Sequence, residues 1–288
     1  MPINGLNIIA EKINDSVPST NKYFKENNYD ALIQLAKEQA DEGAAYIDIN
    51  IGSRPPALMA ELVRKIQDVT DKPIAIDSPD PEIAAAGLEA YDTQKARNRK
   101  PLLNSISMQR LEMFDLIKQK PAKVILMASE RIIDNQFIQN KISQDILDSA
   151  LEIFDIAEEY NIDNDDIIFD PTIAPVGTDY QRLTKMTVEG IELIGKEKRL
   201  KGCHMSVGLS NFSVQLPSKT QSGALVKTPL ENAFLTLCMP NGLDYCIGST
   251  KKNYQILDDD HPALVTLKEI LKLDGYDILS RVQEFYSS

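Results

Sequence analysis

The heptapeptide VGLSNFS at residues 207–213 starts with an apolar residue and continues into small residues that present the amide of Asn211. An apolar run that ends in Gly and Ser predicts a short β-strand followed by a turn. Three other apolar segments also end in one short polar side chain, at Asp77, Asn104 and Asp170. Four such residues at four strand ends indicate a single pocket at one end of a parallel barrel.

Short apolar runs alternate with longer amphipathic segments along all 288 residues. Strands are predicted at about 6–10, 45–49, 73–76, 102–103, 123–127, 166–169, 204–207 and 244–247. Helices are predicted at about 30–42, 57–69, 80–91, 108–119, 143–160, 179–195, 230–238 and 262–273, and residues 216–228 are predicted to form a loop over a site. This alternation, without a composition break, predicts an α/β protein with a single (β/α)8 TIM barrel over residues 1–288. The alternative is an open doubly wound sheet, which usually carries a glycine-rich phosphate turn that is missing here.

Composition excludes several classes of function. The chain is 43% hydrophobic and 26% charged, as in ordinary globular proteins, and its net charge of -12 disfavours nucleic acids and anionic membranes. It contains no run of roughly 20 apolar residues and no basic segment before an apolar core at the N-terminus, so neither a membrane span nor a secretory signal is expected. Three widely spaced cysteines predict reduced thiols and a cytoplasmic protein.

The polar residues at strand ends also have a purely structural interpretation. Asp, Asn and Ser favour turns and helix N-caps for backbone reasons, and this explains any one of them taken alone. On that basis Asp48 is predicted to be a partner for loop amides. His204, beside Cys203 and without a third ligand at useful spacing, is predicted to be a buried strand histidine. His261 is predicted to cap or precede the last helix.

Asp77, Asn104, Asp170 and Asn211 together are better explained by a ligand, because their register places all four at the barrel mouth. Two carboxylates and two amides offer no thiolate or imidazole to a transition metal, so no metal site is predicted. A carboxylate can accept two parallel hydrogen bonds from the 2-amino-4-oxopyrimidine edge of a pterin. The set therefore predicts a flat, hydrogen-bonding heterocycle as the ligand.

Six motifs, in this order, resemble those of the pterin-binding methyltransferases, which use methyltetrahydrofolate and a corrinoid protein. The motifs are IAEKIN at 9–14, IDINIG at 47–52, IDS at 76–78, LNS at 103–105, FDP at 169–171 and GLSN at 208–211. The resemblance implies that Asp77, Asn104 and Asp170 hold the pterin ring. It implies that Asn211 is the catalytic residue, because an amide can donate a hydrogen bond to N5 without ionising. Further implied contacts to the pterin or folate are Gly208, Ser210, Glu11, Asn50 and Lys227, the last at the folate tail.

The resemblance also implies an activity. The expected enzyme moves a methyl group between N5 of tetrahydrofolate and the cobalt of a separate corrinoid protein, within an anaerobic demethylase or one-carbon system. It is expected to be a homodimer and to bind no metal itself. Two alternatives stay open: a dihydropteroate synthase-like enzyme and a folate-binding barrel without transfer activity. Dihydropteroate synthase needs a late Ser-x-Arg-His motif, whereas the last strand here reads DYCIGST at 244–250.

Overall fold

Eight parallel strands form one sheet in the order β10-β1-β2-β3-β4-β5-β8-β9 in the computed structural model, which describes residues 3–287. Bridges from Met205 to Leu243 and from Gly208 to Ile247 join the two ends and close the barrel. The predicted (β/α)8 fold is confirmed, and its predicted limits at residues 1 and 288 lie outside the described residues. The strands are β1 (Asn7–Asn14), β2 (Tyr46–Asn50), β3 (Ile74–Asp77), β4 (Leu102–Ile106), β5 (Lys123–Met127), β8 (Ile167–Asp170), β9 (His204–Met205) and β10 (Tyr245–Gly248).

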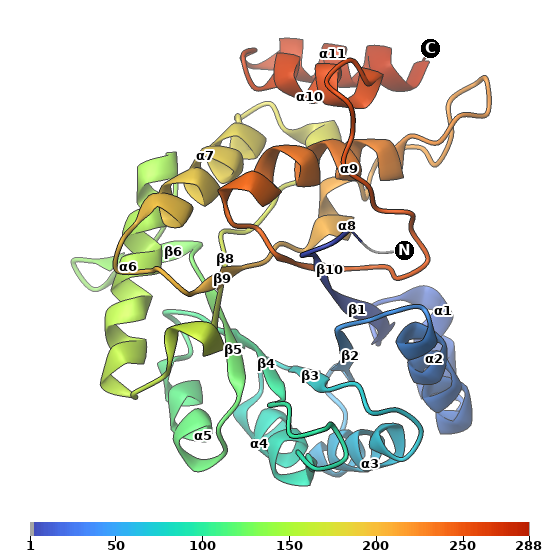
Figure 1. The fold of residues 1–288 in the computed structure, drawn as a ribbon, viewed down its shortest axis with the longest axis vertical. Coiled ribbons are helices and arrows are strands. Elements are labelled where there is room, and N and C mark those ends of the chain that lie inside the picture. Colours follow the sequence, from blue (N-terminus) through green and yellow to red (C-terminus); the bar gives the residue numbers. More distant parts are fainter. Residues whose placement is uncertain (1–2, 288) are drawn as a thin grey trace.

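Helices surround the strands on the outside, and α10 and α11 pack at one edge beyond α9 (Figure 1). α4 shows why the sequence folds this way locally. Pro81 occupies its first turn, and the Asp80 carboxylate accepts a hydrogen bond of 2.8 Å from the Glu82 N–H, as the sequence predicts. The main helices are α1 (Pro18–Lys25), α2 (Tyr29–Asp41), α3 (Pro56–Gln67), α4 (Pro81–Ala90), α5 (Phe114–Gln119), α6 (Ser143–Glu159), α7 (Leu183–Lys196), α8 (Leu209–Phe212), α9 (Lys227–Cys238), α10 (Pro262–Ile270) and α11 (Tyr276–Ser287).

Side-chain alternation along the strands determines what reaches the barrel mouth. One buried layer fills the lumen with Ile9, Tyr46, Ala75, Leu102, Ile125, Ile168 and Tyr245. Because strand side chains alternate between faces, the residue two positions further along each strand also points inward, one layer nearer the C-terminal end. Those residues are Glu11, Asp48, Asp77, Asn104, Met127, Asp170 and Ile247, and all seven line the same cavity.

Several elements differ from the sequence-based expectation. A hairpin of β6 (Glu130–Ile133) and β7 (Gln136–Gln139) follows β5, and α11 follows α10, so the helix at 262–273 does not close the chain. The first strand continues to Asn14, which places Glu11 within it rather than after it.

The predicted helix at 179–195 starts later, at Leu183, for a local reason. The Asp179 carboxylate accepts hydrogen bonds from the backbone N–H groups of Leu183 and Thr184, at 2.8 and 2.7 Å. It thereby satisfies the donors that a helix start leaves free, so Asp179 precedes the helix instead of belonging to it. The predicted helix at 108–119 is likewise a short 3₁₀ turn, Leu111–Met113, followed by α5.

The two histidines have specific partners. His204 lies in β9 as predicted but is only partly buried, and its Nδ1 lies 2.5 Å from Asp244 Oδ2. The prediction of a buried histidine is therefore wrong. The ring is partly exposed at the N-terminal end of the barrel strands, where it pairs with the Asp244 carboxylate. His261 caps α10, accepting a hydrogen bond of 3.2 Å from the Ala263 N–H, which confirms the expected capping role.

No helix within residues 3–287 is both long enough and apolar enough to cross a membrane.

Gly195 marks the closest approach between α7 and the turn Met239–Asn241. A Cβ at this position would lie 2.1 Å from the Asn241 carbonyl oxygen, which is a backbone atom. Replacement by Ala in an open helix stabilises by about 1 kcal/mol, but here the backbone must shift, and we expect Gly195→Ala to destabilise by about 1–3 kcal/mol. Urea unfolding measures this difference, and a stabilised Gly195→Ala protein would contradict the packing described.

Candidate active site

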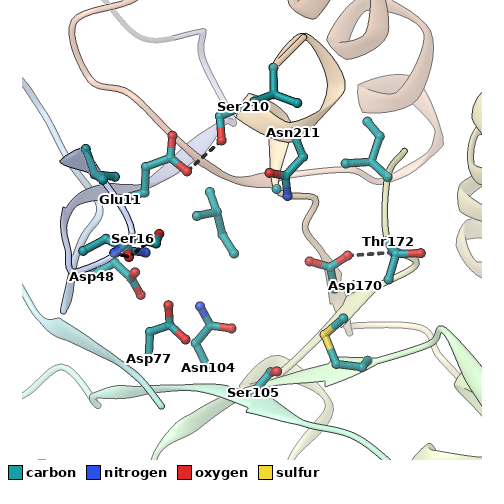
Figure 2. A pocket seen from close by; sticks show the side chains of 17 residues that line it. Glu11, Ser16, Asp48, Asp77, Asn104, Ser105, Asp170, Thr172, Ser210 and Asn211 are labelled. Carbon is teal, nitrogen blue, oxygen red and sulfur yellow. Dashed lines mark hydrogen bonds between the residues drawn. The ribbon is translucent and has the colours of Figure 1, made fainter. Parts of the chain in front are cut away.

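The C-terminal ends of the strands surround a cavity of about 620 Å³. Figure 2 shows Asp77 beside Asn104 on one wall, Asp170 and Thr172 on another, and Asn211 projecting from α8 toward the space between them. The structure thus brings together Asp77, Asn104 and Asp170 with Gly208, Ser210 and Asn211. Glu11 also lines the cavity, whereas Asn50 and Lys227 do not.

Asn50 acts on the cavity through Asp77. Its Nδ2 donates a hydrogen bond of 2.9 Å to Asp77 Oδ2, while its Oδ1 accepts one of 2.9 Å from the Gly52 N–H. The turn after β2 therefore holds the amide in place, and the amide holds the carboxylate. Burial raises the pKa of Asp77, and the hydrogen bond from Asn50 and the charge of Arg110 offset part of that rise.

The prediction that Asp48 is a partner for loop amides is wrong. Its carboxylate points into the cavity instead of binding loop amides, and it is 1% exposed. Within the described part of the chain Oδ1 has no hydrogen-bond partner. Burial first and the neighbouring Asp77 carboxylate second raise the pKa of Asp48 well above its usual range. A buried oxygen without a donor, next to a second carboxyl group, is a position where a ligand N–H or a proton is needed.

Asp170 lies on the opposite side of this floor. Its Oδ1 accepts a hydrogen bond of 2.7 Å from the Thr172 N–H. Burial raises the pKa of Asp170 to about 7, against the lowering effect of the Thr172 N–H and of the nearby Ser206 hydroxyl. Near neutral pH this carboxyl group is therefore poised between its two protonation states, as functional-site carboxyls often are.

α8 carries the amide that the sequence singles out. A Cβ at Gly208 would lie 2.8 Å from the Asn211 Nδ2, so the glycine leaves the space that this side chain occupies. Asn211 itself is exposed to the cavity opening. The VGLSNFS turn therefore combines a residue without a side chain, just before the short helix α8, and a residue with an amide three positions later within it.

Two carboxyl groups hold α8, one at either end. Ser210 Oγ donates a hydrogen bond of 2.9 Å to Glu11 Oε2, and Ser213 Oγ donates one to the fully buried Glu231. Lys252 Nζ donates to both oxygens of Glu231, at 2.6 and 2.8 Å, and so compensates its charge. Burial raises the pKa of Glu11 as well, offset by Ser210 and Lys252.

Lys227 begins α9, and its Nζ donates a hydrogen bond of 3.1 Å to the Val214 carbonyl. Val214 lines the cavity, so Lys227 lies behind the rim instead of in the cavity wall. Its implied contact to a ligand stays a prediction.

The donor set fits a heterocycle better than a metal. Within residues 3–287 no group of three His, Cys, Asp or Glu side chains could hold a metal ion. The cavity-lining residues of this part of the chain include no Lys, Arg or His, so no cation faces the ligand space. Several hydrogen-bond acceptors and a few amide donors remain, as a neutral ring with N–H groups along one edge requires.

Titration of Asp170 makes the stability of the ligand-free protein depend on pH. Its folded-state pKa of about 7 lies above the ordinary value of 3.8, so the folded state binds the proton more tightly. The stabilisation is complete below pH about 4 and is lost as pH rises through about 7. In the wild type the free energy of unfolding should fall by up to about 4 kcal/mol over this range, and Asp170→Asn, which cannot ionise, should not show this fall. Urea unfolding between pH 4.5 and 8 measures it, with the exposed Asp41→Asn as control, and parallel curves for wild type and Asp170→Asn would contradict the assignment.

Comparison with known proteins gives a consistent picture. The chain is 28% identical over 247 residues to the methylcorrinoid:tetrahydrofolate methyltransferase of Eubacterium limosum, covering 83% of each chain. Its fold is similar to dihydropteroate synthase of Xanthomonas albilineans with 4-aminobenzoic acid, at a TM-score of 0.59, 15% identity and coverage of 94% and 93%. Dihydropteroate synthase of Yersinia pestis gives a TM-score of 0.57 at 13% identity, with coverage of 93% and 91%. The family model described as pterin binding enzyme matches residues 13–248, and the chain therefore belongs to the pterin-binding enzymes.

Proposed function

We propose that this enzyme transfers a methyl group between N5 of tetrahydrofolate and the cobalt of a corrinoid carried by a separate protein. One observation carries the proposal. An uncharged donor, Asn211, faces a floor of carboxyl and amide groups across a cavity whose described lining contains no cation. A pyrophosphate leaving group, which dihydropteroate synthesis requires, would lie in that cavity without a positive charge to stabilise it.

Asp77, Asn104 and Asp170 are the proposed partners of the pterin ring, and Asp48 adds a fourth acceptor beside Asp77. A bound N–H group would supply the hydrogen bond that Asp48 Oδ1 lacks. Binding should therefore lower the pKa of Asp170 toward its ordinary range, since hydrogen bonds to the charged form favour it.

The transfer step changes the bonding of N5. When the methyl group moves to tetrahydrofolate, the N5 lone pair forms the bond to the methyl carbon, the cobalt–carbon bond breaks with both electrons left on the cobalt, and N5 loses its proton to solvent. In the other direction the cobalt electron pair forms the new bond, the N5–carbon bond breaks with its electrons left on N5, and N5 takes up a proton. Asn211 is the proposed hydrogen-bond donor to N5. Its amide can keep N5 in place both with and without the methyl group, and it does not ionise. The corrinoid supplies the methyl-carrying cobalt from the partner protein. The chain itself contributes positioning and electrostatic stabilisation.

The family resemblance also supports a cytoplasmic homodimer that acts within a demethylase or one-carbon system. The three cysteines are free within residues 3–287, in accord with a reducing compartment. The mouth of the barrel must then remain accessible to the corrinoid-carrying protein.

Incubation of the protein with methylcobalamin and tetrahydrofolate tests the activity. We expect 5-methyltetrahydrofolate to form, and Asn211→Ala to lower kcat by about 10- to 1000-fold while the Kd for tetrahydrofolate changes little. Binding of tetrahydrofolate without transfer in either direction would leave a folate-binding barrel. Formation of dihydropteroate from p-aminobenzoate and pterin pyrophosphate would replace the proposal with the synthase activity.

Gly208→Ala is expected to act through Asn211. The new methyl group would meet the end of a flexible side chain, so the fold should tolerate it, but the amide must move. A displacement of about 1 Å at a reacting group can cost about 100-fold in rate. A double-mutant cycle checks this, because Gly208→Ala should have no further effect on kcat in an Asn211→Ala background. Additive losses would show that Gly208 acts independently of the amide.

A further inference from the structure

A row of three cavities leads from the candidate active site to a basic rim between the β5–α6 and β8–α7 units, and we propose that it binds the tail of a polyglutamylated folate. This proposal rests on the proposed function, because it assumes that the pterin occupies the central cavity. It assigns the p-aminobenzoyl group to the middle cavity and the γ-linked glutamates to the outer one.

The middle cavity adjoins the central one. It measures about 380 Å³, and Thr172 and Ile173 line both cavities. Its remaining walls combine three apolar side chains, Ala174, Leu183 and Met186, with four polar ones, Ser129, Gln139, Asn140 and Thr187. Apolar side chains beside amide and hydroxyl groups suit an aromatic ring that continues into an amide bond.

The outer cavity adjoins the middle one at Met186, which lines both. It measures about 300 Å³ and lies between the start of α6 and the start of α7, which pack side by side (Figure 1). Its charged lining consists of three cations, Lys141, Arg182 and Lys185, and one carboxylate, Glu189. Among the described residues, neither the central cavity nor the middle cavity has a Lys or Arg in its lining.

These cations are available to a ligand. Lys185 pairs with Glu189 at 3.2 Å and Arg182 with Asp274 at 2.6 Å, but all four side chains are at least one-third exposed. Exposed pairs of this kind contribute little, so a ligand carboxylate can replace the protein partner. Within the described residues no acidic side chain forms an ion pair with Lys141. In a protein of net charge -12, such a local excess of positive charge favours a carboxylate at this position.

The sequence favours a different exit for the tail, past Lys227. That lysine lies behind Val214 at the start of α9, and its Nζ donates a hydrogen bond to the Val214 carbonyl. The two routes diverge from the same cavity, so variants separate them.

The experiment compares tetrahydrofolate monoglutamate with the triglutamate, measuring Kd by calorimetry and KM in the methyl transfer assay. For the wild type we expect Kd and KM to be about 3- to 10-fold lower for the triglutamate, and the preference to weaken at 0.5 M salt. Lys141→Ala combined with Lys185→Ala should abolish the preference, and Lys185→Glu should reverse it, while kcat with the monoglutamate stays unchanged. Lys196→Ala is the matched control, because Lys196 is an exposed lysine of the same helix that pairs with Glu192 four residues earlier, and it should keep the full preference.

Equal affinity of the wild type for both folates would overturn this proposal and leave methyl transfer standing. Loss of the preference in Lys227→Ala, but not in the Lys141 and Lys185 variants, would overturn it in favour of the other exit. Failure of both folates to bind would overturn this proposal together with the proposed function.

Discussion

Closure of the barrel at the seam between β9 and β10 is the constraint on which the site depends. β9 has only two residues, and the seam is reinforced by one side chain: Asp244 accepts a hydrogen bond of 3.2 Å from the Met205 N–H and pairs with His204. The chain that leaves this seam becomes α8, so the position of Asn211 follows from it. Glu11 from β1 and Glu231 from α9 then tie α8 through Ser210 and Ser213. The four-residue helix α8, which carries Asn211, is thereby held by three separate parts of the barrel.

The carboxyl groups that line the candidate active site lower the stability of the ligand-free protein. Burial raises the pKa values of Glu11, Asp48, Asp77 and Asp170, so each is harder to ionise than in water. A ligand that presents several N–H groups relieves these desolvated oxygens together. The burial of these carboxyl groups therefore both destabilises the ligand-free protein and favours the binding of such a ligand.

Much of the architecture could be predicted from the sequence because strand–helix alternation is a local pattern. The cavity floor follows from side-chain alternation, and that rule could have identified Asp48: it stands two residues after Tyr46, as Asp77 stands two after Ala75. The preference of Asp for turns concealed it. Other features do not follow from strand–helix alternation. The Asp179 cap depends on a side chain that bonds the backbone of the next turn, the β6–β7 hairpin on the pairing of two four-residue strands, and the position of Lys227 on its bond to the Val214 carbonyl.

The fold is similar to that of dihydropteroate synthases at 15% identity or less, and this likeness alone says little about chemistry. In the proposed function, recognition of the pterin needs only the floor, where Asp77, Asn104 and Asp170 lie. The reaction would then depend on what faces N5 and the group attached to the pterin. A cation there stabilises a departing phosphate, whereas an amide engages N5 without attracting an anion. The amide of Asn211, and the lack of a basic side chain among the described lining residues, therefore support the proposed exchange of a methyl group rather than departure of pyrophosphate.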